Sequence, residues 1–82
     1  MIAPTVKSML VMEGMKRNEA AAALGITAQA MSNKYNRDSF SADDLLKVAT
    51  AAGYNLAFVR KRDGLMITFP GPAEGQDQTK TE

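Results

Sequence analysis

The segment that most constrains this chain covers residues 17–35, RNEAAAALGITAQAMSNKY, where two short helix-forming stretches flank a glycine. Gly25 stands where the first helix should end, because a residue without a Cβ turns the chain easily through positive φ. Ile26 then directs an apolar side chain inward, and Thr27 can cap a second helix by accepting a backbone N–H. The pattern predicts a helix, a tight turn and another helix. The expected helices cover residues 17–24 and 28–35.

The alanines of the first helix indicate how closely its neighbours approach. Ala20, Ala21 and Ala23 add little bulk, so another helix can come almost into backbone contact. The apolar positions that follow have the spacing of inward-facing residues in the DNA-binding form of this motif. The segment resembles the helix-turn-helix of the Cro and lambda-repressor-like family, also called the xenobiotic response element family. The resemblance is carried by Ala21, Leu24, Gly25, Ile26 and Met31, and it extends from about Thr5 to about Gly53.

Two positions depart from the family pattern. Lys16 stands where a capping Thr or Ser is usual, and Ala20 stands where a Leu is common. Because a lysine side chain offers no acceptor to an N-terminal N–H, the helix could also begin near Asn18, whose side chain can cap. The pattern establishes this helix but leaves its first residue open.

Two further helices are predicted from apolar spacing and end signals. Pro4 marks the entry of a helix over residues 5–13, in which apolar side chains recur at three- and four-residue intervals. Ser41 and Asp44 have the spacing of a capping box, which predicts a helix over residues 42–52. The six methionines of the chain are interpreted as adaptable core filling.

The hydrophobic period then changes to two, which is typical of strands. Asp63 and Gly64 separate two such runs, and this dipeptide is a strong hairpin signal because both positions of the tight turn need positive φ. A two-residue turn would place Phe58 opposite Phe69. The expected strands cover residues 55–61 and 65–69. Beyond them, residues 70–82 lack apolar periodicity and are expected to form a disordered tail.

The 82 residues suffice for one small core. The predicted fold is mainly α, a four-helix lambda-repressor-like helix-turn-helix domain followed by a C-terminal β-hairpin, over residues 1–69. The chain has no Cys and no His, which removes disulfides and the commonest general base and metal ligand. Without an activated nucleophile, we expect no enzyme and no metal or cofactor. No stretch approaches a membrane span or a secretory signal, so a cytoplasmic protein is expected.

The outer face of the second helix of the motif is small and rich in amides. At about 100° per residue, Gln29, Ser32 and Asn33 fall on one side, while Met31 and Tyr35 fall on the other. A merely solvated face would usually carry Lys and Glu at four-residue spacing, which this stretch lacks. The family resemblance implies that this face reads DNA bases through Ala28, Gln29, Ser32 and Asn33. Gln and Asn pair bidentately with adenine, and Ala can meet a thymine methyl.

Charge supports DNA binding only weakly. The net charge of +1 divides into +3 over residues 1–64 and −2 over residues 65–82. A pI of about 8.0 lies below the value of about 9 that usually marks a DNA-binding domain. In the DNA-binding interpretation, phosphate contacts hold the protein in register on the duplex. The residues expected to make them are Arg17, Thr27, Lys34, Asn36 and Arg37.

The predicted function is a sequence-specific, DNA-binding transcriptional regulator of Cro or repressor type, with residues 28–35 in the major groove of a palindromic operator. The alternative is a protein-interaction module such as an antitoxin or anti-repressor, which the modest charge favours. Because one helix-turn-helix reads few base pairs, a homodimer on double-stranded DNA is expected. The candidate interface is the hairpin, through Leu65, Ile67 and Phe69, unless the hairpin only covers the helices of its own chain.

Overall fold

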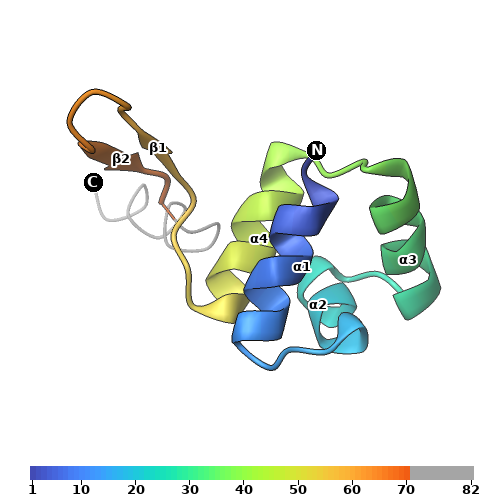
Figure 1. Ribbon diagram of the computed structural model, residues 1–82. Helices are drawn as coiled ribbons and strands as arrows, with labels where there is room; N and C mark the ends of the chain where they lie inside the picture. Colours follow the sequence, from blue (N-terminus) through green and yellow to red (C-terminus); the bar gives the residue numbers. More distant parts are fainter. Residues whose placement is uncertain (71–82) are drawn as a thin grey trace, which may run out of the picture.

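The computed structural model describes residues 1–70 and contains four helices followed by a two-stranded antiparallel hairpin (Figure 1). The mainly α class with a C-terminal hairpin is therefore confirmed. Within the described residues, every helix is too short to span a lipid bilayer. The tail expected over residues 70–82 lies outside the described residues except for Pro70. The elements are α1 (Ala3–Met12), α2 (Arg17–Leu24), α3 (Ala28–Arg37), α4 (Ala42–Ala52), β1 (Ala57–Val59) and β2 (Met66–Thr68).

The turn between α2 and α3 closes on a glycine, as the sequence predicts. Gly25 has φ 72°, and the backbone N–H of Ile26 donates to the carbonyl of Ala21 at 3.0 Å. Ala20 and Ala21 are 0% and 1% exposed in the core, and α2 packs against both α3 and α4. Met31 of α3 is fully buried in the same cluster. The core comprises Ala3, Val6, Leu10, Ala20, Ala21, Met31, Phe40 and Val48.

Helix α2 begins at Arg17, so the alternative start near Asn18 is wrong. The carboxylate of Glu19 accepts the backbone N–H of Lys16 at 2.7 Å. This is the glutamate half of a capping box, and it satisfies an N-terminal donor without needing an acceptor on the lysine side chain. The helix therefore starts at a residue that capping preferences alone disfavour.

The first helix begins earlier than expected, at Ala3, because an acceptor arrives from a distant part of the chain. The carboxylate of Asp38 accepts the backbone N–H of Ile2 at 2.9 Å and that of Ala3 at 2.6 Å. Asp38 also follows the last turn of α3 with φ 54°, in the left-handed conformation that ends this helix after Arg37. One side chain thus joins the end of α3 to the start of α1.

The hairpin has a longer turn than the two-residue turn expected. Ala57 pairs with Thr68 and Phe58 with Ile67, so the predicted pairing of Phe58 with Phe69 is wrong. Only Gly64 of the turn has positive φ, and the carboxylate of Asp63 binds Arg60 and the backbone N–H of Leu65. This side-chain network stabilises a four-residue loop. Because the register shifts by two residues, each side chain keeps its predicted face.

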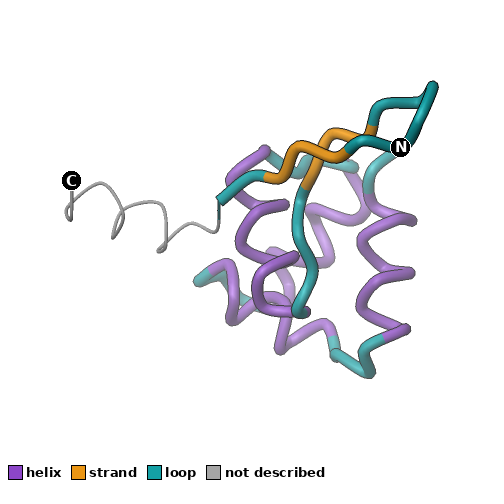
Figure 2. Tube along the Cα trace, turned by 90° about the vertical axis from the view of Figure 1, so that its left-hand side faces the viewer, coloured by secondary structure: helices purple, strands orange, loops and turns teal. Residues whose placement is uncertain are grey.

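The hairpin extends away from the helices, and α3 lies on the opposite side of the helical body (Figure 1). Figure 2, viewed from the hairpin side, shows the two strands in front of the helices. Its apolar side chains are largely exposed, at 68% for Phe58 and 64% for Ile67. The alternative that the hairpin covers the helices of its own chain is therefore wrong for this structure. The interpretation of all methionines as core filling also fails, since Met1, Met12 and Met66 are exposed.

We expect Asp38→Ala to lower the free energy of unfolding by about 2 kcal/mol, from the lost cap and from an alanine at positive φ. The matched control is Asp38→Gly, which removes the carboxylate but accepts the left-handed conformation and should cost about 1 kcal/mol. Urea denaturation measures both. Midpoints equal to that of the wild type would show that this carboxylate does not stabilise the start of α1.

Candidate nucleic-acid interface

Helix α3 is held by its inner face and presents its outer face to solvent. Met31 is 0% exposed, and Tyr35 packs against Phe40 with ring centroids 5.9 Å apart. Burial raises the pKa of the Tyr35 hydroxyl, and the nearby positive charge of Arg17 partly offsets this effect. The tyrosine therefore stays neutral. These inward contacts fix the rotation of the helix about its axis, and so fix which side chains point outward.

The four residues predicted to read bases lie together on the outer side of α3. Gln29 and Asn33 are exposed, while Ala28 and Ser32 are half-buried. The Nε2 atom of Gln29 donates to Oδ1 of Asn33 at 3.5 Å, so the two amides lie side by side along the helix. This bond leaves the oxygen of Gln29 and the amide nitrogen of Asn33 available to another molecule.

Ser32 has a partner that the sequence does not reveal. Arg17, the first residue of α2, donates from Nη1 to Oγ of Ser32 at 2.8 Å. The bond occupies an acceptor site of the hydroxyl and leaves its proton free to be donated elsewhere. It also holds the guanidinium beside the outer face of α3. Residues 15 positions apart in the chain are thus joined at the edge of the candidate surface.

The beginning of α3 is capped locally. The hydroxyl of Thr27 accepts the backbone N–H of Ala30 at 3.1 Å, which fixes the exposed first turn. The remaining N-terminal N–H groups carry the positive end of the helix dipole and suit a negatively charged group. Thr27 is itself exposed, and its hydroxyl proton remains available to a phosphate oxygen.

The two basic residues at the end of α3, Lys34 and Arg37, differ in their surroundings. Lys34 is paired with Asp44 of α4, with Nζ 2.9 Å from Oδ2, and also reaches the carbonyl of Ser39 at 3.4 Å. This pairing argues against the phosphate contact predicted for Lys34, because its charge is already compensated within the fold. Asn36 and Arg37 are exposed at the last turn, as a phosphate contact requires.

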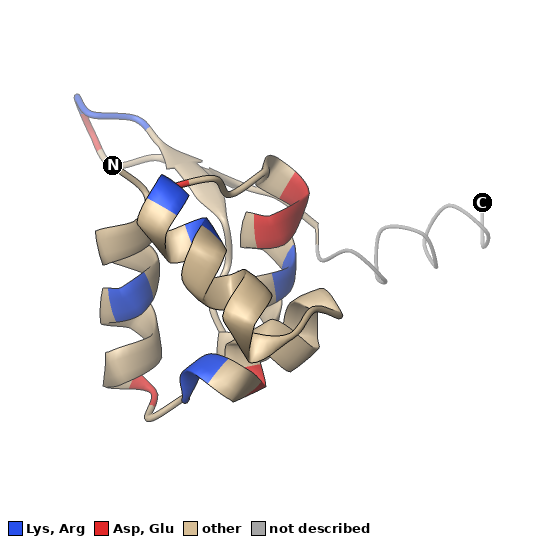
Figure 3. Ribbon diagram, turned by 90° about the vertical axis from the view of Figure 1, so that its right-hand side faces the viewer, with Lys and Arg blue, Asp and Glu red and all other residues tan. Residues whose placement is uncertain are grey.

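A further cation, on α1, was not predicted. Lys7 lies with Nζ 4.9 Å from the centroid of the Tyr35 ring, so its charge stands beside α3. Figure 3 looks onto this side of the molecule and shows basic residues on α1 and α2 and at the end of α3. Residues 28–33 of α3 carry no charged side chain. The uncharged polar centre is therefore flanked by the basic residues Lys7, Arg17 and Arg37, although acidic residues also lie on this side of the molecule (Figure 3). The described residues contain no cluster of acidic side chains suited to a metal ion.

The family comparison agrees with this arrangement. Residues 5–67 match the model of the bacteriophage CI repressor helix-turn-helix domain. The chain belongs to this family. The match covers α1 from Thr5 onward, the other three helices and most of the hairpin, and it identifies a DNA-binding transcription regulator of the repressor kind. No curated protein and no solved structure matches the chain.

The Lys34 and Asp44 pair makes stability depend on pH. Burial acts to raise the pKa of Asp44, but hydrogen bonds from Lys34 and Ser41 outweigh it and lower the pKa below the ordinary 3.8. A lowered carboxyl pKa stabilises the fold above about pH 3.8, and this stabilisation is lost as the pH falls through the folded-state pKa.

Accordingly, we expect Asp44→Asn to be less stable than the wild type at pH 7, with a difference that shrinks as the pH falls below about 4. Chemical denaturation at a series of pH values measures the difference. The control is Asp43→Asn, which removes an exposed ion pair with Lys47 and should change stability little. A pH-independent difference for Asp44→Asn would contradict this role.

Proposed function

We propose that this CI repressor-type domain binds a palindromic operator specifically, with α3 in the major groove. The observation that carries the proposal is the outer face of α3, which is amide-rich, uncharged over residues 28–33 and bordered by the basic side chains of Lys7, Arg17 and Arg37. A neutral hydrogen-bonding surface suits base edges, and the surrounding cations suit the two phosphate backbones. Such a repressor would meet DNA in the cytoplasm.

The hydrogen bonds already present suggest what each side chain reads. Gln29 retains a free amide oxygen beside a donor, which is the pattern that pairs with N6 and N7 of adenine. Asn33 has its amide nitrogen free, and Ser32 has its hydroxyl proton free, so both side chains can donate to acceptor atoms of the bases. Ala28 can contact a thymine methyl group. No Arg or Lys belongs to this reading set, so we expect a site centred on A·T pairs.

Phosphate contacts would come from both ends of α3. Arg17 and Thr27 stand near its beginning, and Asn36 and Arg37 stand at its last turn. Lys7 is a further candidate because its ammonium lies beside the Tyr35 ring, whereas the bond to Asp44 makes Lys34 a poorer one.

We further propose that the domain is a homodimer through β2. Arg60 donates its N–H to Leu65, and Phe69 donates to Leu56, so in the alternating antiparallel pattern the N–H and C=O groups of Met66 and Thr68 point away from β1. This open edge can pair with the same edge of a second chain.

The choice of β2 over β1 follows from charge and exposed apolar area. The basic residues Arg60, Lys61 and Arg62 follow β1 directly and would repel their counterparts near a two-fold axis. Leu65 and Ile67 are 47% and 64% exposed, and Phe69 is half-buried, so pairing would cover apolar area along this strand. Two domains joined in this way could occupy half-sites about 34 Å apart.

We expect the double variant Gln29→Ala, Asn33→Ala to lose its preference for the best operator while retaining nonspecific binding. Each amide pair contributes about 1–3 kcal/mol of discrimination, whereas the phosphate contacts remain. Operators selected from random duplexes and fluorescence anisotropy give the ratio of specific to nonspecific affinity. Arg37→Ala is the contrast: it should weaken all sequences alike and reduce the salt slope by about one. Preference that survives the double change would exclude α3 as the reader.

The alternative, a protein-interaction module, is supported by the modest net charge of +1. Binding of a mixed-sequence duplex at two salt concentrations separates the two functions. Phosphate contacts release counterions, so a DNA-binding domain must lose affinity steeply as salt rises. A chain that binds no duplex at low salt would favour the protein-interaction function.

Ile67→Asp tests the dimer, because it would bring carboxylates together where the two copies of β2 meet. We expect this variant to sediment as a monomer at micromolar concentration, where the wild type is a dimer. The matched control is Val59→Asp, an exposed apolar residue of β1, which should remain dimeric. A monomeric wild type, or a folded Ile67→Asp variant that stays dimeric, would rule out this interface.

A further inference from the structure

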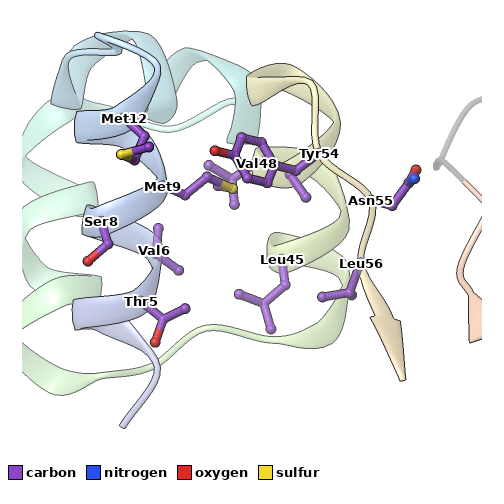
Figure 4. Close-up of a pocket in the computed structure, with 11 residues that line it drawn as sticks. Thr5, Val6, Ser8, Met9, Met12, Leu45, Val48, Tyr54, Asn55 and Leu56 are labelled. Carbon is purple, nitrogen blue, oxygen red and sulfur yellow. The ribbon is translucent and has the colours of Figure 1, made fainter. Parts of the chain in front are cut away.

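A groove of about 410 Å³ lies between α1, α4 and the segment that leads into β1 (Figure 4). Apolar side chains from these three parts point into it, and Met12, although 76% exposed, forms part of its wall. Tyr54 stands at one end and donates its hydroxyl to Glu13 at 3.0 Å. The principal lining residues are Val6, Met9, Met12, Leu45, Val48 and Leu56.

The groove faces away from α3, toward the side on which the hairpin leaves the helices (Figures 1 and 4). It is therefore separate from the surface proposed to meet DNA. An open apolar groove of this kind is a recognised feature of sites that bind another apolar surface.

The same chain carries an apolar surface that its own helices do not cover. Side chains at alternate positions share one face of the hairpin, which we call the hairpin face. Phe58 and Phe69 stack there with centroids 5.2 Å apart, yet Phe58 and its cross-strand neighbour Ile67 remain 68% and 64% exposed. Pairing through the edge of β2 would satisfy backbone groups but would leave this face in water. The hairpin face consists of Phe58, Leu65, Ile67 and Phe69, with Arg60 at its loop end, whereas Leu56 at its base lines the groove of its own chain.

We propose that the groove receives the hairpin face of a second copy of this chain, and that the exchange is reciprocal across a two-fold axis. The proposal rests on the homodimer proposed above and specifies where each hairpin lies in it. Both surfaces are then buried in the same dimer, which an isologous interface requires. The apolar character of each surface matches that of the other.

Length and charge define the direction of the docked hairpin. The groove follows α1 from Thr5 to Met12, about 10 Å at 1.5 Å per helical residue. From Phe58 to Lys61 the hairpin also extends about 10 Å at 3.3 Å per residue. With the loop toward Met12, the cations Lys61 and Arg62 reach Glu13. Among the described residues these three side chains have no ion-pair partner, so the contact is complementary in charge.

Disulfide trapping tests this arrangement, because the chain contains no cysteine of its own. Full-length Met12→Cys and Lys61→Cys variants are purified separately, mixed in equal amounts and oxidised, and the mixed disulfide is quantified by intact mass. A bond between chains of different mass can form only in trans. The control mixture contains Val11→Cys with Lys61→Cys, because Val11 is as exposed as Met12 but does not line the groove.

We expect the mixture with Met12→Cys to give at least fivefold more mixed disulfide than the control. Equal yields would overturn the proposal. A double Met12→Cys, Lys61→Cys chain that closes an internal disulfide while the mixture gives none would also overturn it, since the hairpin would then dock in cis. Sedimentation of the same chains distinguishes docking in the groove from dimer formation itself. A dimer that lacks the mixed disulfide excludes docking in the groove but is compatible with the β2 homodimer and with DNA binding.

Discussion

The close approach of α2 to α3 and α4 depends on two alanines, and the placement of α3 follows from it. Ala20 and Ala21 are fully buried, so neighbouring helices lie near the α2 backbone and Met31 fits completely inside. Interiors packed to this density hold a helix in one rotation, because a turn about its axis would force large side chains into occupied space. The outer face of α3 is therefore set by the contacts of its inner face.

The predictions that succeeded depend on interactions within a few residues. Gly25 ends α2 through its positive φ, Thr27 caps α3, and Ser41 with Asp44 forms the capping box of α4. Each device involves atoms at most five residues apart, so the sequence displays it directly. The inward side of α3 was predictable for a similar reason, since helical periodicity separates Met31 and Tyr35 from the amides.

The features that the sequence did not reveal join distant residues. Asp38 caps a helix 35 residues before it, and Arg17 reaches Ser32 across the turn. The sequence predicted a phosphate contact for Lys34, but in the fold its ammonium pairs with the carboxylate of Asp44. The prediction of the hairpin register failed for a different reason. The side chain of Asp63 stabilises a four-residue loop, and the Asp-Gly dipeptide does not distinguish that loop from a two-residue turn. For Asp38, Arg17 and Lys34 the deciding partner is chosen by tertiary geometry, whereas for the hairpin it is a choice between two local turns.

The hairpin lies on the side of the helical body opposite α3, and most of its apolar side chains are uncovered (Figure 1). An exposed two-stranded hairpin is marginal in water, so its stability must come from something that it contacts. If that contact is a second copy, the stability of the hairpin and the formation of the dimer are coupled, and the same contact fixes the distance between the two copies of α3. Operator affinity would then depend on protein concentration through the hairpin, although no hairpin residue needs to touch DNA.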